Sequence, residues 1–264
     1  MLLPKHLATL LLGAAATLSS LSFAAPTVES GDPSVSVNET ENYYGEYHPL
    51  AARATKFSSL KGTAASWSKL STLCAQGKRK RDLSSLEIEI SEDIHIDARQ
   101  LTWPPATPKG FTAVLQGKSD AAFASGNGLW TYGLVTCLGI GVVGTPPSAI
   151  NEPRHMLHME STAAVMDAQW DTFEKRVKAA KLTRMRGYMS VPDTTRNTPA
   201  SWDADMTQLT NAIIVEARTR LQTLTGSAPV VKTRPMSRAL AHETPYGTMW
   251  IDNRNDVFIE GLKA

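Results

Sequence analysis

The chain has 264 residues, of which 42% are hydrophobic and 20% are charged, a globular composition with room for one or two domains. Nine Lys/Arg and five Asp/Glu give residues 1–81 a net charge of +4, whereas 18 Lys/Arg and 20 Asp/Glu give residues 82–264 a net charge of −2. The larger part therefore has no basic excess, which argues against nucleic-acid binding as its main role.

The first 25 residues have the pattern of a secretory signal peptide. Lys5 and His6 precede an uncharged apolar run over residues 7–21, and small residues follow at Ser22 and Ala24. The run is shorter than the roughly 20 residues that a membrane-spanning helix needs. We therefore expect the segment to be cleaved, which gives a secreted, extracellular protein without a membrane anchor.

Residues 26–81 have the features of a pro-segment. They include one expected helix, at 55–73, and end in Lys78-Arg79-Lys80-Arg81. Behind a signal peptide, such a basic run is typical of a secretory processing site, although a solvated loop and a nuclear-localisation or nucleic-acid patch are alternatives. We predict a signal peptide over 1–25, a pro-segment over 26–81 and a single domain over 82–264.

The remaining chain predicts strands and two long helices in alternation. Helices are expected at 161–181 and 202–224, where apolar residues recur at helical spacing, with Ser201 as a cap of the second and Gly226 as its stop. Strands are expected at 86–97, 111–115, 129–132, 136–143, 154–159, 184–191, 230–232, 249–251 and 257–259. This order predicts a mixed α/β (α+β) fold, a central sheet or sandwich packed with two long helices.

Two cysteines, Cys74 and Cys137, lie on opposite sides of the basic run. A secreted protein would ordinarily pair them, but cleavage after Arg81 would leave Cys137 alone. Four states stay open: a structural disulfide, an inert buried thiol, a reactive thiol, and a disulfide that holds the precursor inactive until cleavage and reduction.

Possible partners for a reactive Cys137 surround it in the sequence. Thr131 lies six residues before it, and His155 and His158 follow a Gly/Pro-rich turn. A thiol and an imidazole on neighbouring strands can form the thiolate–imidazole pair of nucleophilic catalysis. Strand alternation puts His155 and His158 on opposite faces, so only one can face Cys137. His242, before Pro245, is a lesser candidate.

The segment T-Y-G-L-V-T-C from Thr131 to Cys137, with His155 18 residues after Cys137 and a helix behind it, resembles the bacterial chemoreceptor glutamine deamidase CheD. That family shares its fold with the cytotoxic necrotizing factor toxins, and the likeness extends over about residues 110–260. The resemblance implies a CheD-like deamidase fold with Cys137 as nucleophile, His155 as general base, favoured over His158 by its spacing, and Thr131 orienting the imidazole.

The expected activity is that of a secreted cysteine-dependent protein glutamine deamidase. Its partner would be a protein substrate with an exposed glutamine, and we expect a monomer that uses no cofactor. The alternative is a catalytically inactive secreted binding protein of the same fold, with Cys137 structural. A metal site of His155, His158 and Cys137 is disfavoured, because His-x-x-His on a strand directs the two rings to opposite faces.

Overall fold

The computed structural model describes residues 56–76, 105–240 and 246–264, which lie within one unit, Ala51–Ala264. The predicted signal peptide, the basic run at 78–81, the strand at 86–97 and His242 fall outside the described residues. Within the described part of the chain, no helix is both long and apolar enough to cross a membrane.

One five-stranded sheet forms the centre of the fold. Its order is β2 (Ser119–Ala122), β5 (Arg154–Met159), β4 (Leu138–Thr145), β6 (Thr183–Pro192) and β7 (Val230–Arg234). Neighbouring strands are antiparallel except β6 and β7, which are parallel. Most of β4 is buried, as expected for a central strand that is covered on both faces.

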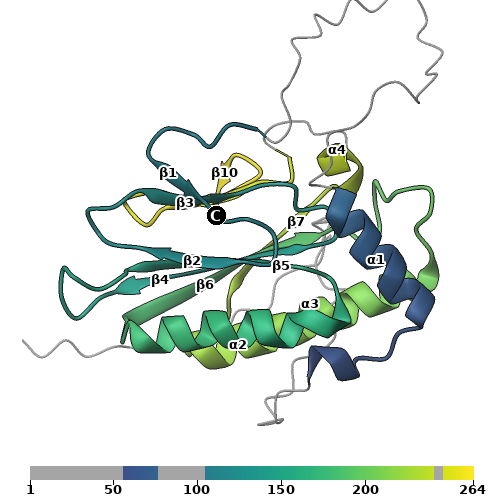
Figure 1. Ribbon diagram of the computed structural model, residues 1–264, viewed down its shortest axis with the longest axis horizontal. Helices are drawn as coiled ribbons and strands as arrows, with labels where there is room; N and C mark the ends of the chain where they lie inside the picture. The colour runs from purple at the N-terminus through teal and green to yellow at the C-terminus, as the bar shows by residue number, and fades with distance from the viewer. Residues whose placement is uncertain (1–55, 77–104, 241–245) are drawn as a thin grey trace, which may run out of the picture. The chain divides into compact units, whose positions relative to one another are not determined.

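A second five-stranded sheet covers one face of the first (Figure 1). Its order is β1 (Phe111–Ala113), β3 (Gly128–Thr131), β8 (Met249–Ile251), β9 (Val257–Ile259) and β10 (Leu262–Lys263). Leu129, Met156, Met249 and Ile251 are among the apolar side chains packed between the sheets. A Cβ added at Gly141 of β4 would lie 2.8 Å from the Met249 methyl group, so the glycine permits this close approach.

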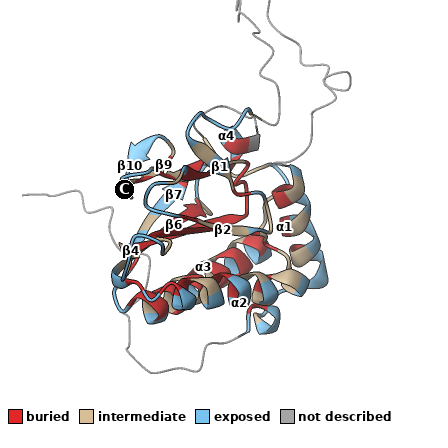
Figure 2. Cartoon of the chain, turned by 60° about the vertical axis from the view of Figure 1, so that its left-hand side comes forward, coloured by how far each residue is buried: buried red, intermediate tan, exposed pale blue. Residues whose placement is uncertain are grey.

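Two long helices, α2 (Ala163–Ala179) and α3 (Ala204–Thr225), cover the other face of the central sheet (Figure 1). Figure 2 shows that their buried residues gather on the sides turned toward the sheet. A short 3₁₀ helix, η1 (Phe57–Ser59), contacts α2, and α1 (Ala64–Gln76) contacts α3. Helix α4 (Met236–Leu240) follows β7.

The segment before the basic run is part of this core. Phe57, Leu70 and Leu73 are buried in the same apolar cluster as the inner faces of α2 and α3. The carboxylate of Asp167 accepts hydrogen bonds from the backbone N–H groups of Phe57 and Ser58, at 2.9 and 3.1 Å. Residues 57–76 are therefore integrated with the strands and helices that follow.

The mixed α/β class and the two long helices are confirmed. The described residues contain ten strands, and β5 has the predicted bounds. One capping prediction is wrong: Asp203, not Ser201, caps α3 by accepting a hydrogen bond from the Met206 N–H at 2.8 Å. Gly226 ends α3 as predicted, in the left-handed region at φ 73°.

Candidate functional site

Cys137 lies immediately before β4 and is completely buried between the two sheets. It forms a disulfide with Cys74 of α1, with a Cα–Cα distance of 5.4 Å, and neither of the two cysteines is free. Cys74 is also fully buried, and its Sγ accepts a hydrogen bond from the Gln116 amide at 3.2 Å. In this form of the protein the sulfur of Cys137 is therefore not available as a nucleophile.

His158 lies on the same face of the central sheet as Cys137. The β4–β5 register pairs His158 with Gly139, two residues after Cys137. Because side chains alternate along a strand, Cys137 and Gly139 share a face, and Cys137 is the diagonal neighbour of His158. Diagonal positions on antiparallel strands are roughly 7–8 Å apart, within reach of long side chains.

A hydrogen bond from the second sheet holds the imidazole. Thr131 ends β3, and its buried Oγ1 lies 2.8 Å from Nδ1 of His158 and 2.7 Å from the carbonyl oxygen of Val114. A hydroxyl has one proton, and the Val114 carbonyl can only accept, so Thr131 donates to Val114 and accepts from Nδ1–H of His158. A neutral His158 therefore carries its proton on Nδ1, which makes Nε2 the basic atom.

The predicted pairing of Thr131 with His155 is corrected by this geometry. Thr131 contacts His158, because the register of the β4–β5 hairpin turns His158 toward the second sheet. The prediction that the two histidines occupy opposite faces of the strand is confirmed, since Leu157 packs with the helices and Met156 packs between the sheets. His155 is on the helix side.

His155 is fully buried, and its Nε2 lies 3.1 Å from the carbonyl oxygen of Glu152. Burial lowers the pKa of His155 from 6.5 to about 4, although the nearby Glu152 carboxylate opposes the change. The ring is thus neutral near pH 7 and belongs to the packing between β5 and α2.

The backbone that leads into Cys137 is fixed by side chains from several elements. Thr136 Oγ1 donates to the Leu70 carbonyl at 2.9 Å, and Ser161 Oγ donates to the Thr136 carbonyl at 2.6 Å. Arg234, the last residue of β7, donates to the carbonyls of Leu134, Val135 and Cys137 and to Ser190 Oγ. Sequence reasoning missed Arg234, since a basic residue at a strand end is ordinarily exposed.

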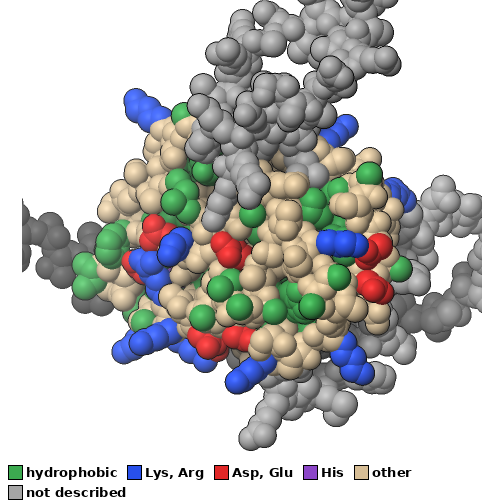
Figure 3. Space-filling view, turned by 45° about the vertical axis from the view of Figure 1, so that its right-hand side comes forward, with side chains coloured by type: hydrophobic (Ala, Val, Ile, Leu, Met, Phe, Trp, Pro, Cys, Tyr) green, Lys and Arg blue, Asp and Glu red, His purple; other side chains and the backbone are tan. Residues whose placement is uncertain are grey.

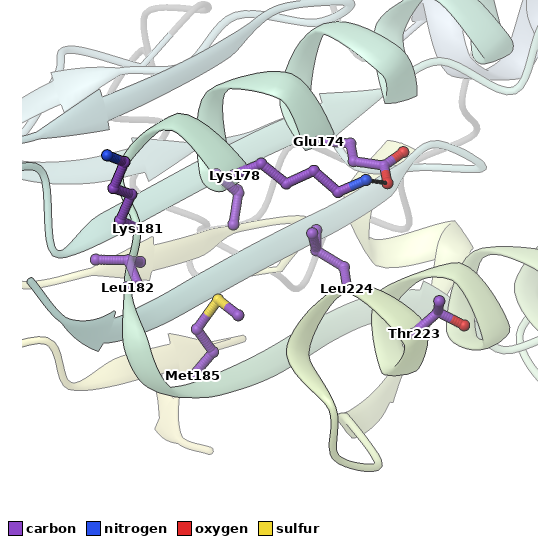
Figure 4. A pocket seen from close by; sticks show the side chains of 8 residues that line it. Glu174, Lys178, Lys181, Leu182, Met185, Thr223 and Leu224 are labelled. Carbon is purple, nitrogen blue, oxygen red and sulfur yellow. Dashed lines mark ion pairs between the residues drawn. The ribbon is translucent and has the colours of Figure 1, made fainter.

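Cys137 lines neither of two surface hollows in the described part of the chain. One, of about 260 Å³, lies between the C-terminal ends of α2 and α3 and the start of β6, with Leu182, Met185 and Leu224 at its floor and Lys178 paired with Glu174 at its rim (Figure 4). No cysteine, serine or histidine lines it. Among the described residues, no group of three or more His, Cys, Asp or Glu side chains is arranged to hold a metal ion.

On the face in Figure 3, the charged side chains of the described residues are of both signs and interspersed, without a basic patch of the kind that binds nucleic acid.

No model of a known protein family matches the chain, and no curated protein matches it in sequence.

Proposed function

We propose that this protein is the disulfide-locked form of a secreted cysteine-dependent protein glutamine deamidase with a CheD-like fold. Cys137 is the nucleophile, His158 the general base, and Thr131 the residue that orients the imidazole. The observation that carries the proposal is the buried hydrogen bond between Thr131 Oγ1 and His158 Nδ1, on the face that also holds Cys137. In a nucleophile–imidazole pair, a third side chain of this kind holds the imidazole in its working orientation.

The chemistry follows once Cys137 is reduced. His158 Nε2 takes the thiol proton, and the thiolate attacks the carboxamide carbon of a substrate glutamine. The imidazolium then protonates the leaving nitrogen, the C–N bond breaks, ammonia departs and a thioester remains. Water, deprotonated by His158, attacks the thioester. The C–S bond breaks, glutamate forms, and the sulfur regains its proton from the imidazolium.

The disulfide makes reduction a requirement for this activity. A sulfur bonded to Cys74 has no thiolate form, and α1 carries Cys74 into the core beside Cys137. A dithiol reductant that attacks Cys74 Sγ would release Cys137 as the leaving thiolate. In this proposal, the disulfide-bonded protein is a latent enzyme.

A second function is favoured by the burial of both cysteines. Cys74 and Cys137 are 0% exposed, and the segment that carries Cys74 is part of the core. In this alternative the disulfide is permanent, and the protein is a catalytically inactive secreted binding protein.

Ammonia release from an unfolded, glutamine-rich protein such as casein separates the two functions. The full chain is compared with its Cys74→Ser variant, in which Cys137 has no partner, and with Cys74→Ser/Cys137→Ser. We expect ammonia only from Cys74→Ser and from the reduced wild type. In the Cys74→Ser background, His158→Gln lowers the rate by about 10²-fold or more, whereas the matched His155→Gln leaves it unchanged. No ammonia from folded Cys74→Ser protein, with or without reductant, would refute the deamidase and favour the binding protein.

A further inference from the structure

Two arginines, Arg154 and Arg234, are 0% exposed, and each guanidinium is surrounded by backbone carbonyl groups. Arg154, at the start of β5, donates to the carbonyls of Ala124 and Asn127, in the β2–β3 loop, and of Asn253, in the β8–β9 hairpin. Arg234, the last residue of β7, lies beside Cys137. The two arginines can be compared directly, because both are buried and both donate to backbone carbonyl groups, but only Arg234 contacts the Cys137 backbone.

The backbone acceptors of Arg234 lie within four consecutive residues, 134–137. Its Nε donates to the Leu134 carbonyl, and its Nη2 donates to the carbonyls of Val135, at 3.1 Å, and of Cys137. In a trans peptide the N–H points opposite to the C=O. The N–H groups of residues 135, 136 and 138 therefore point away from the guanidinium. One side chain thus sets the direction of three of the peptide units around Cys137.

The guanidinium also places a positive charge at this backbone. Burial lowers the pKa of Arg234 to about 9, while Glu260 acts to raise it, so the group is charged near pH 7. Glu260 accepts a hydrogen bond from the Gly247 N–H at 2.6 Å, and Arg238 of α4 also acts on its charge. The ionisable groups linked to Arg234 are then Glu260 and, through Glu260, Arg238, while His158 of β5 lies on the same face of the sheet as Cys137.

We propose that Arg234 is the positioning residue of Cys137: it holds the 134–137 backbone in one conformation and favours the thiolate form of the reduced sulfur. Its catalytic consequence rests on the deamidase proposed above, but its effect on the thiol does not. Arginine suits the task because its planar fork reaches several carbonyls at once, which the single ammonium of lysine cannot do.

The test uses the full chain with Cys74→Ser, so that Cys137 is the only thiol. The first readout is the ultraviolet absorbance of the thiolate as a function of pH. Arg234→Met should raise the Cys137 pKa by about 1 unit or more, since a nearby opposite charge shifts a pKa by about 1–3 units. Arg154→Met, the matched control, should leave that pKa unchanged. Equal thiol titrations in the two variants would overturn the electrostatic part of the proposal.

The second readout is amide hydrogen exchange, with a variant that keeps the charge. Arg234→Lys should speed exchange over residues 134–138 by about tenfold or more, and Arg154→Lys should not. Unchanged exchange over residues 134–138 would overturn the positioning role, and this readout serves even where Arg234→Met does not fold. A raised thiol pKa in Arg234→Met, in a protein that releases no ammonia, would support the positioning residue and refute the deamidase.

Discussion

The buried His155 should make the protein less stable as the pH falls, and His155→Gln tests this directly. His155 lies on β5 with no exposed surface, and its Nε2 is 3.1 Å from the Glu152 carbonyl oxygen. Burial is the main reason that its pKa falls to about 4, and the charge of Arg176 adds to the effect, against the opposing influence of Glu152. Glutamine keeps a hydrogen-bond donor at this position but does not titrate.

The direction of the pH effect on stability follows from how His155 binds a proton in the folded and in the unfolded state. Between pH 6.5 and about 4, His155 is protonated in the unfolded chain and neutral in the folded protein. The stabilisation is therefore complete above pH 6.5 and is lost as the pH falls through this window. At about 1.4 kcal/mol per pKa unit, the loss between pH 7 and pH 4 amounts to about 3 kcal/mol.

Urea unfolding of the full chain at pH 7, 5.5 and 4, with the disulfide intact, measures this loss. The free energy of unfolding of the wild type should fall by about 3 kcal/mol more than that of His155→Gln between pH 7 and pH 4. Every other titrating group is common to both proteins, so its contribution cancels in the difference. If the free energy of unfolding of the two proteins fell by the same amount between pH 7 and pH 4, His155 would not be a buried neutral imidazole.

Three further outcomes are expected. Cys74→Ser should lower the free energy of unfolding by about 4 kcal/mol, because the disulfide closes a loop of 63 residues, and an unshifted urea midpoint would contradict this. Gly128→Ala should destabilise by about 1–3 kcal/mol, since its Cβ would lie 2.7 Å from a backbone carbonyl oxygen. Gly141→Ala should cost less, as compared by thermal melting, because its Cβ would meet only side-chain atoms, the Met249 methyl group at 2.8 Å and Ile251 Cδ1 at 3.2 Å. Asp167→Asn should weaken the anchor at Ser58 and speed limited proteolysis there relative to the wild type, and equal cleavage rates would argue against that anchor.

The two long helices and most strands could be predicted because their sequences carry a clear period, whereas the helix expected at 55–73 is a short 3₁₀ helix followed by α1 over Ala64–Gln76. Trp170, Phe173 and Val177 recur at helical spacing and are buried on α2 as predicted. Strand β2 was missed, since Ser-Asp-Ala-Ala lacks β-branched and aromatic residues, and it is a strand because it pairs with β5. The strand propensity of a short segment does not reveal a strand that exists because it pairs with a neighbouring strand.

A histidine beside Thr131 was predicted, but the histidine that contacts Thr131 is His158 and not His155. Thr131 and Cys137 could be selected from the motif, but the choice between His155 and His158 depends on the register of the β4–β5 hairpin. A shift of one residue exchanges the faces of a strand, and the long connection between these strands does not fix the register by its length. Arg234 is 100 residues from its acceptor Leu134 in sequence, so no local pattern connects them.

The position of Cys74 has a consequence for the predicted processing. A cut at Lys78–Arg81 would separate two chains that are still joined by the disulfide and by the burial of Phe57, Leu70 and Leu73 in the common core. Burying each such side chain contributes roughly 1.5–3 kcal/mol, so cleavage alone would not release the segment. Reduction alone would free the sulfur of Cys137, because the disulfide to Cys74 is the bond that removes its thiolate form. In the deamidase we propose, reduction is therefore the activating step, and cleavage at the basic run neither frees the sulfur nor removes the segment that carries Cys74.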